Sequence, residues 1–163
     1  MKLLLSACCA PCATVAIEEL SKTHSVTVFF WGNNIHPEQE YKKRLEALVI
    51  LTKSEANGKN LRCPLIIADY QPIQPTSCEQ CFEMRLNATA EYADKHGYDY
   101  FATTLTTSPH KDAELINKIG NRISAKYLPT DFKKNDGFNR SVVLSKQLGL
   151  YRQKYCGCQK TSD

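Results

Sequence analysis

The chain has 163 residues, of which 42% are hydrophobic and 23% are charged, and its formal net charge is +4. This length is typical of one domain that buries its own core, and no apolar run approaches the ~18 residues of a membrane span, so a soluble single-domain protein is expected. The positive charge is compatible with a nucleic-acid substrate but does not by itself indicate one.

The first residues, 1–5, resemble a signal peptide only superficially. The apolar run stops at Ser6, and a cysteine pair follows where a cleavage region would be expected. We interpret this segment as the first strand of a cytoplasmic protein. Because the cytosol keeps thiols reduced, eight cysteines are poorly explained as a disulfide framework. Metal or redox chemistry is the leading explanation.

Strand and helix patterns alternate along the whole chain. Ser77 followed by Gln80 matches a capping box and indicates a helix start there. The predicted elements are a strand at 2–6, a helix at 13–22, a strand at 25–31, a helix at 37–57, a strand at 65–68, a helix at 77–97, a strand at 98–104, and helices at 110–126 and 137–148.

This alternation predicts a single α/β domain over residues 1–163, with a Rossmann-like, mostly parallel sheet and helices on both faces. In such sheets, ligands bind beyond the carboxyl ends of the strands. Residues of unusual chemistry follow the four predicted strands in turn: Cys8, Cys9 and Cys12; Asn33, Asn34 and His36; Asp69 and Tyr70; and residues 104–108.

Three segments carry the cysteines of interest. Cys8, Cys9 and Cys12 lie around the first strand-to-helix turn, where the helix dipole favours thiolates, although a buried inert pair is an equal alternative. Cys78 and Cys81 share one face of a helix start and could form a redox pair or half of a zinc site. The third segment is Cys156-Gly157-Cys158, a spacing common in metal loops.

The number of these cysteines favours an iron–sulfur cluster. Seven thiols exceed the four ligands of one zinc site, and a cluster with additional thiolates fits the count better. The spacing matches neither ferredoxin pattern, so this interpretation depends on the three segments converging at one end of the sheet. Cys63 precedes Pro64 and an apolar run, and we predict that it is a core residue.

Five motifs, in this order, resemble the epoxyqueuosine reductase QueH family over essentially the whole chain. They are Cys8-Cys9-Ala10-Pro11, Asn34-Ile35-His36-Pro37 with Glu40-Tyr41, Cys78-x-x-Cys81 with Arg85-Leu86, the run from Phe101 to Ser108-Pro109, and Tyr151-Arg152-Gln153-Lys154-Tyr155-Cys156-Gly157-Cys158.

The resemblance implies a metalloenzyme that removes the epoxide oxygen of epoxyqueuosine at the wobble position of tRNA and so completes queuosine. It implies a [4Fe-4S] cluster, an additional iron ion and a low-potential electron donor such as a ferredoxin or flavodoxin. Cys12 stands where family members vary between Cys and Asp, so its role stays open. The metal ligands carried over from the family are Cys8, Cys9, Cys78, Cys81, Cys156 and Cys158.

Converting an epoxide to an alkene takes two electrons and two protons. A cluster supplies electrons singly, and a nearby metal can act as a Lewis acid on the epoxide oxygen. The candidate proton donors are Asp69, Tyr70 and Tyr155, and the candidate substrate-binding residues are Asn34, His36, Arg85, Thr104, Ser108 and Arg152. Each has an ordinary structural alternative. Further candidates for phosphate contacts are Lys42, Lys43, Arg44, Lys133, Lys134, Arg140 and Lys154.

Two other functions compete with this one. The first is a thiol-disulfide reductase that uses Cys78 and Cys81. The second is a zinc-stabilised RNA-binding module without catalysis. Both leave several cysteines unexplained.

Overall fold

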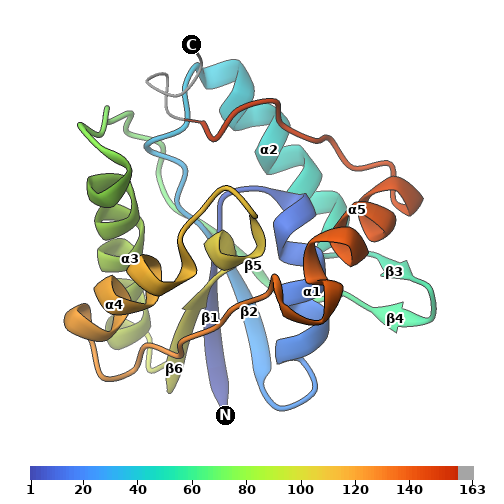
Figure 1. Cartoon of the computed structure of the whole chain (residues 1–163), viewed down its shortest axis with the longest axis horizontal. Helices are drawn as coiled ribbons and strands as arrows, with labels where there is room; N and C mark the ends of the chain where they lie inside the picture. The colour runs from blue at the N-terminus through green and yellow to red at the C-terminus, as the bar shows by residue number, and fades with distance from the viewer. Residues whose placement is uncertain (158–163) are drawn as a thin grey trace.

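A computed structural model describes residues 1–157, and its centre is a parallel sheet of four strands (Figure 1). The predicted ligand Cys158 lies outside the described residues. The strands are β1 (Lys2–Ala7), β2 (Ser25–Phe30), β5 (Leu65–Ile67) and β6 (Tyr100–Thr103), in the order β5-β2-β1-β6. All three pairings are parallel, which confirms the predicted fold class.

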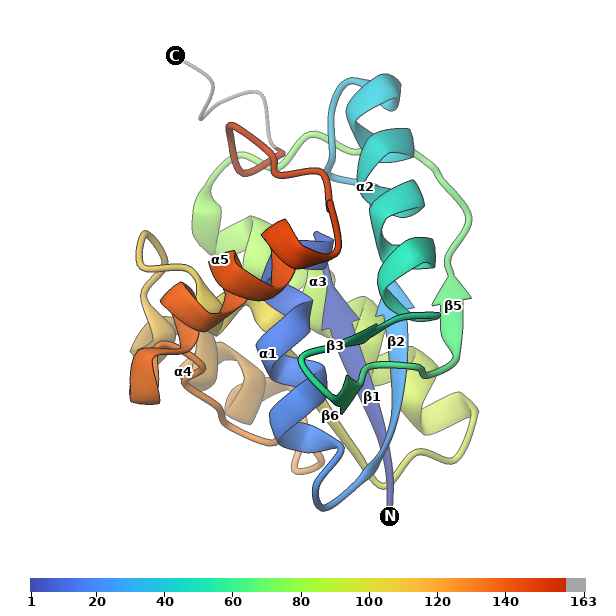
Figure 2. The ribbon, with the colours of Figure 1, turned by 90° about the vertical axis from the view of Figure 1, so that its right-hand side faces the viewer.

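Helices cover both faces of this sheet (Figures 1 and 2). On one face, α1 (Ala10–Leu20) packs against α2 (Glu38–Leu51) and α5 (Gly137–Gln147). On the other face, α3 (Cys78–Lys95) packs against α4 (Ala113–Ile123). None of the helices formed by residues 1–157 is both long and apolar enough to cross a membrane.

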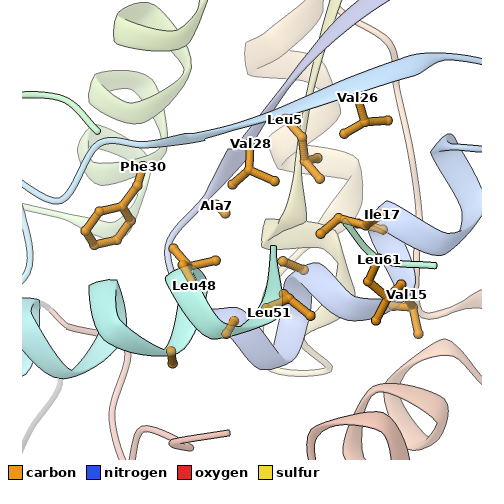
Figure 3. Close-up of a cluster of buried hydrophobic side chains, with 14 of the residues drawn as sticks. Leu5, Ala7, Val15, Ile17, Val26, Val28, Phe30, Leu48, Leu51 and Leu61 are labelled. Carbon is orange, nitrogen blue, oxygen red and sulfur yellow. The ribbon is translucent and has the colours of Figure 1, made fainter. Parts of the chain in front are cut away.

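The central strand β1 is buried on both faces because its side chains alternate between two cores. Leu3, Leu5 and Ala7 pack with residues of α1 and α2, a core shown in Figure 3, whereas Leu4 packs toward α3 and α4. Burying a leucine side chain contributes about 1.5–3 kcal/mol. Packing on both faces therefore fixes the position of the end of β1, which Cys8 follows.

The strand order creates a switch point between β1 and β6. The chain runs from β1 through α1 to β2 and through α2 to β5, and then α3 leads back to β6 on the far side of β1. Ligands bind at such a point in open α/β sheets. The Cys8-Cys9 pair and the short 3-10 helix η1 (Thr104–Thr107) follow the two strands that flank it.

The start of α1 and the end of α2 differ from the prediction. Helix α1 begins at Ala10, with Pro11 in its first turn, so Cys12 lies inside the helix rather than in the preceding turn. Helix α2 ends at Leu51, well before residue 57. Asn57 and Gly58 have φ values of 52° and 71° and form the turn of a hairpin between β3 (Glu55–Ala56) and β4 (Lys59–Asn60). Asn-Gly favours this turn.

The starts of α3 and α4 are set by capping side chains. The Ser77 hydroxyl accepts a hydrogen bond from the Gln80 backbone N–H at 3.1 Å, as the capping-box pattern predicts. Helix α4 starts after Asp112, whose carboxylate accepts from the Leu115 N–H, and not at residue 110. His110 and Lys111 therefore lie in a loop. The 3-10 helices η1 and η2 (Lys134–Asp136) were not predicted.

We predict that Gly120→Ala destabilises the protein. Replacing a glycine inside a helix by alanine normally stabilises by ~1 kcal/mol. At this position an added Cβ would lie 2.4 Å from Cε1 of Tyr127, whose hydroxyl donates to Asn117, so the ring cannot move without losing that bond. Urea denaturation should show a loss of about 1–3 kcal/mol.

The exposed Lys118→Ala on the same helix is the control and should change the free energy of unfolding by less than ~0.5 kcal/mol. A Gly120→Ala variant as stable as the parent protein would contradict this packing.

Candidate functional site

Two cavities adjoin beyond the carboxyl end of β1. The first cavity has a volume of about 380 Å³ and the second about 580 Å³. Five residues line both of them, which makes the cavities neighbours: Cys8, Leu105, His110, Lys111 and Cys156. The site therefore lies at the switch point between β1 and β6, where the fold predicts a ligand.

The predicted metal ligands gather around these cavities. The second cavity is lined by Cys8, Cys78, Cys81 and Cys156, and the first by Cys8, Cys9, Cys12 and Cys156. These include all five predicted ligands that lie within residues 1–157. Cys63 lines neither cavity. It packs half-buried against the core, and burial raises its pKa to about 11.

Without a bound metal, the cysteine environment favours thiols over thiolates. The hydrogen bond with Cys9, followed by burial, raises the pKa of Cys8 well above its usual value. The hydrogen bond with Cys12 is the largest cause that raises the pKa of Cys9 to about 11. Burial raises the pKa of Cys81. The environment of these three cysteines therefore does not favour the thiolates expected from the helix dipole, and coordination of a metal cation would displace their protons.

Three cations near the cysteines act in the opposite direction. Arg85 and Lys111 lower the pKa of Cys8, and Arg44 lowers that of Cys9. Arg85 is 3% exposed, lines the second cavity, and donates from Nη1 to the Trp31 carbonyl oxygen at 3.0 Å. Positive charge of this kind suits an anionic group held by several thiolates.

The chain after α5 returns across α2 (Figure 1), and we call its residues 151–157 the C-terminal strap. Arg44 on α2 is 1% exposed and donates to the carbonyl oxygens of Tyr155 at 2.7 Å and Cys156 at 3.1 Å. Its Nε donates to Glu40 at 2.9 Å, and the same carboxylate accepts from the Tyr151 hydroxyl at 2.6 Å. Because Arg44 is buried in this network, its prediction as a phosphate contact was wrong.

Asn34 and His36 were predicted to bind substrate, but neither lines a cavity. The Asn34 side-chain amide donates to Cys81 Sγ at 2.7 Å. The His36 backbone N–H donates to the Gly157 carbonyl, and its own carbonyl accepts from the Tyr155 hydroxyl. The structure therefore places both residues in contact with the cysteine-bearing segments.

The three predicted proton donors lie in different surroundings. Tyr155 lines the first cavity. Asp69 is exposed, and the Tyr70 hydroxyl donates to the Ile35 carbonyl oxygen at 2.9 Å while its ring packs on Tyr41. Neither Asp69 nor Tyr70 lines either cavity. The structure thus brings only Tyr155 to the site.

The remaining predicted substrate contacts do line the cavities. Thr104, Ser108 and Arg152 line the first cavity, and Arg85 lines the second. The Thr104 hydroxyl is buried and has no hydrogen-bond partner among residues 1–157. The Oε1 of Gln153, on the same cavity, is also buried and unpaired within that range. Two buried polar groups without partners suit a polar ligand.

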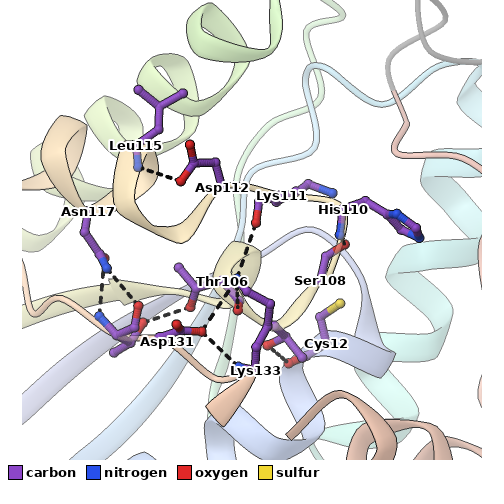
Figure 4. Close-up of polar contacts among 12 residues, drawn as sticks. Cys12, Thr106, Ser108, His110, Lys111, Asp112, Leu115, Asn117, Asp131 and Lys133 are labelled. Carbon is purple, nitrogen blue, oxygen red and sulfur yellow. Dashed lines mark hydrogen bonds and ion pairs between the residues drawn. The ribbon is translucent and has the colours of Figure 1, made fainter.

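Sequence reasoning missed His110, Lys111 and Gln153. The loop that carries His110 and Lys111 is tied to the site by Lys133, whose ammonium donates to the carbonyls of Thr106 and Lys111 (Figure 4). Both residues follow η1 and Ser108 in the segment after β6, so the rule that ligands bind beyond strand ends could have found them. They were missed because the helix was predicted to begin at residue 110, which placed both residues inside it.

The donors around the second cavity are of the kind that a metal cluster uses. Within residues 1–157, no three His, Cys, Asp or Glu side chains are arranged to hold a metal ion, and the further predicted ligand Cys158 lies outside that range. The four cysteine ligands of a [4Fe-4S] cluster are spread around the cluster and do not meet at one metal atom. Four cysteines line the second cavity. The number and type of donors therefore fit a [4Fe-4S] cluster.

The chain is also similar to known proteins. The model of the family described as "Epoxyqueuosine reductase QueH" matches residues 3–162. This chain belongs to the epoxyqueuosine reductase QueH family. A relative of that name from Staphylococcus epidermidis is 38% identical, over 96% of this chain and 74% of its own. Relatives of the same name from Streptococcus pyogenes and Thermotoga maritima are 39% and 35% identical, over 96% and 95% of this chain and 68% and 87% of theirs.

Membership of the QueH family confirms the resemblance drawn from the five motifs. The structure brings cysteine-bearing motifs together, because segments up to 148 residues apart, from Cys8 to Cys156, line the same two cavities. The ligand roles of these cysteines stay predictions.

We predict that Arg44→Met loosens the C-terminal strap. Removing one partner of a buried ion pair leaves Glu40 uncompensated and should cost about 3–5 kcal/mol of stability. The strap would also lose the two hydrogen bonds that Arg44 donates to its backbone, so trypsin should cleave faster after the exposed Arg152 and Lys154. Urea denaturation and mass spectrometry of timed digests measure the two effects.

The matched control is Lys42→Met, which removes an exposed ion pair on the same helix and should cost less than ~1 kcal/mol. Equal cleavage of the strap in both variants would contradict the role of Arg44.

Proposed function

We propose that this protein is an epoxyqueuosine reductase that converts epoxyqueuosine in tRNA to queuosine, the last step of queuosine biosynthesis. One observation carries the proposal. In a chain of the QueH family, the cysteines of three separate motifs line two adjoining cavities at the switch point of the sheet. The names of the relatives specify the substrate.

The reaction breaks both C–O bonds of the epoxide and forms a carbon–carbon double bond. The oxygen leaves as water, so the step consumes two electrons and two protons. Amino-acid side chains can provide the protons but not the electrons. The enzyme therefore needs a redox cofactor and an external reductant, for which a low-potential donor such as a ferredoxin or flavodoxin is suited.

We assign the [4Fe-4S] cluster to the second cavity and an additional iron ion to the neighbouring cysteines. The proposed ligands for the two are Cys8, Cys9, Cys78, Cys81, Cys156 and Cys158. Four of them line the second cavity, whose other side chains include Phe82, Leu105 and Leu115. When bound, the cluster would supply electrons one at a time, and the iron would act as a Lewis acid.

The first cavity is the proposed place of the modified base. Thr104 and Gln153 present buried polar atoms that have no partner among the described residues, and such atoms can hydrogen-bond to a polar substrate. Tyr155 lines the same cavity and is the favoured proton donor. The wobble base lies in a loop and can be splayed into a pocket without opening a duplex.

Basic side chains at the first cavity are positioned for the tRNA backbone. Arg152 and Lys154 are exposed on the strap, and Lys111 lies on the neighbouring loop. Phosphate contacts of this kind position a nucleic acid without reading its sequence.

The competing functions have less support. A thiol-disulfide reductase that uses Cys78 and Cys81 would leave Cys8, Cys9 and Cys156, which line the same two cavities, without a role. A binding module without catalysis does not fit a family of reductases.

The proposed activity predicts a direct conversion. Anaerobically purified protein with a low-potential reductant should convert epoxyqueuosine to queuosine in tRNA. Mass spectrometry of nucleosides from digested tRNA measures the amounts of epoxyqueuosine and queuosine. Persistent epoxide with protein that retains its iron and acid-labile sulfide would contradict the proposal.

The cysteines should differ in their effect on iron content. Cys81→Ser should lose most of the iron and acid-labile sulfide, because a proposed cluster ligand is removed. Cys9→Ser should keep the visible absorbance of the cluster but lose turnover, because Cys9 lines only the first cavity. Cys63→Ser is the control and should keep its full iron content. A folded Cys63→Ser variant without a cluster would show that this assignment is wrong.

Tyr155→Phe should reduce the rate of conversion by about 10²–10⁴-fold if its hydroxyl donates a proton. Tyr70→Phe is closely matched, because the Tyr70 hydroxyl donates to the Ile35 carbonyl as the Tyr155 hydroxyl donates to the adjacent His36 carbonyl, but Tyr70 does not line the cavity. Single-turnover rates separate the two variants. Equal losses in both would indicate a structural role for Tyr155.

A further inference from the structure

Asn34 makes an unusual contact for a residue that lines neither cavity. Its side-chain Nδ2 lies 2.7 Å from the sulfur of Cys81, which is 47 residues away in the first turn of α3. Asn34 is 1% exposed. An amide nitrogen can only donate, so the sulfur is the acceptor in this bond. Accepting a hydrogen bond is what the sulfur of a thiolate ligand does.

Of the two polar atoms of the Asn34 amide, the donor Nδ2 makes a hydrogen bond within residues 1–157. Asn34 Oδ1 is buried and has no hydrogen-bond partner among residues 1–157, while Nδ2 faces the sulfur. A buried carbonyl without a partner is unfavourable, and such exceptions in proteins often occur at functional sites. The contact with Cys81 is therefore the polar interaction that the Asn34 side chain makes within the described part of the chain.

The loop around Asn34 is fixed on both sides. On one side, Asn33 accepts from the Gln71 backbone N–H through its side chain, at 2.8 Å. On the other side, the Ile35 carbonyl accepts from the Tyr70 hydroxyl, at 2.9 Å. This bonding leaves little freedom for the amide to turn away from Cys81.

A hydrogen bond to a cysteine ligand changes the electronic properties of a cluster. The donor withdraws electron density from the sulfur, so adding an electron to the cluster becomes easier and the reduction potential rises. Burial strengthens the effect, because a hydrogen bond is electrostatically stronger in a medium of low dielectric constant.

We propose that Asn34 is a positioning residue that donates a hydrogen bond to Cys81 as a cluster ligand and raises the reduction potential of the cluster. This inference rests on the proposed function, because it requires a cluster bound through Cys81. It gives Asn34 a role in tuning electron transfer instead of the substrate contact predicted from its position after the second strand.

The test is a redox titration of the reconstituted protein, followed by electron paramagnetic resonance. Asn34→Leu and Asn34→Ala both remove the donor, and the control Asn87→Ala removes an exposed amide further along the helix that carries Cys81. At a fixed potential, the ratio of reduced to oxidised cluster should fall about tenfold in the Asn34 variants, a shift of about 59 mV to lower potential for a one-electron couple. Asn87→Ala should titrate like the parent protein.

The outcomes separate this inference from the proposed function. If the parent protein binds the cluster and converts epoxyqueuosine, but the Asn34 variants titrate at the same potential, only this inference is overturned. If the parent protein binds no cluster, both are overturned.

A second measurement covers variants that fail to bind the cluster. In parent protein labelled with ¹⁵N at the asparagine side chains, pulsed electron paramagnetic resonance of the reduced cluster should detect a coupled nitrogen. The absence of that coupling would overturn the inference.

Discussion

The buried guanidinium of Arg44 joins helix α2 to a strap that lies 111 residues further along the chain. Burying an ion pair costs desolvation energy, which good geometry and additional hydrogen bonds can offset. Here the guanidinium donates to Glu40 and to two strap carbonyls, and Glu40 also accepts from Tyr151. The position of Cys156 on both cavities depends on this network.

The same network explains the glycine between the two terminal cysteines. Gly157 has a φ of 110°, which side-chain-bearing residues rarely adopt, and an added Cβ would lie 3.0 Å from Nη1 of Arg44. The strap can therefore approach the guanidinium closely only with glycine at this position.

The topology of the sheet accounts for the rest of the site. Cys8 and Cys9 follow the central strand β1, and Thr104 follows its neighbour β6. Helix α3 begins beside them with Cys78 and Cys81 before it returns along the sheet. Chain segments far apart in sequence thus supply sulfur, buried hydroxyls and cations to one place, which is the combination that a reductive reaction on a polar base requires.

Much of the fold could be predicted from local patterns. The strands are short apolar runs, and the start of α3 follows from its capping side chains. The end of α2 was predicted wrongly, because the residues before Gly58 are compatible with a helix until the Asn-Gly turn is recognised.

The site could be predicted only in part, because its remaining features depend on long-range contacts. From its sequence neighbours, Arg44 would be expected at the protein surface. Its burial is explained by its hydrogen bonds to the strap carbonyls, which the sequence does not reveal. Asp69 and Tyr70 follow a strand end, as the rule requires, but that strand is β5 at the edge of the sheet, two strands from the switch point. Strand order cannot be read from the sequence of the strands alone.

The central claim is that the adjoining cavities at the switch point hold the redox metals. An anaerobic crystal structure with anomalous data collected at the iron absorption edge tests it most directly. We predict a compact iron signal in the second cavity, bounded by Cys8, Cys78, Cys81 and Cys156, with a separate iron site beside it. Iron bound away from these cysteines, or a disulfide between Cys78 and Cys81 in active protein, would contradict the account.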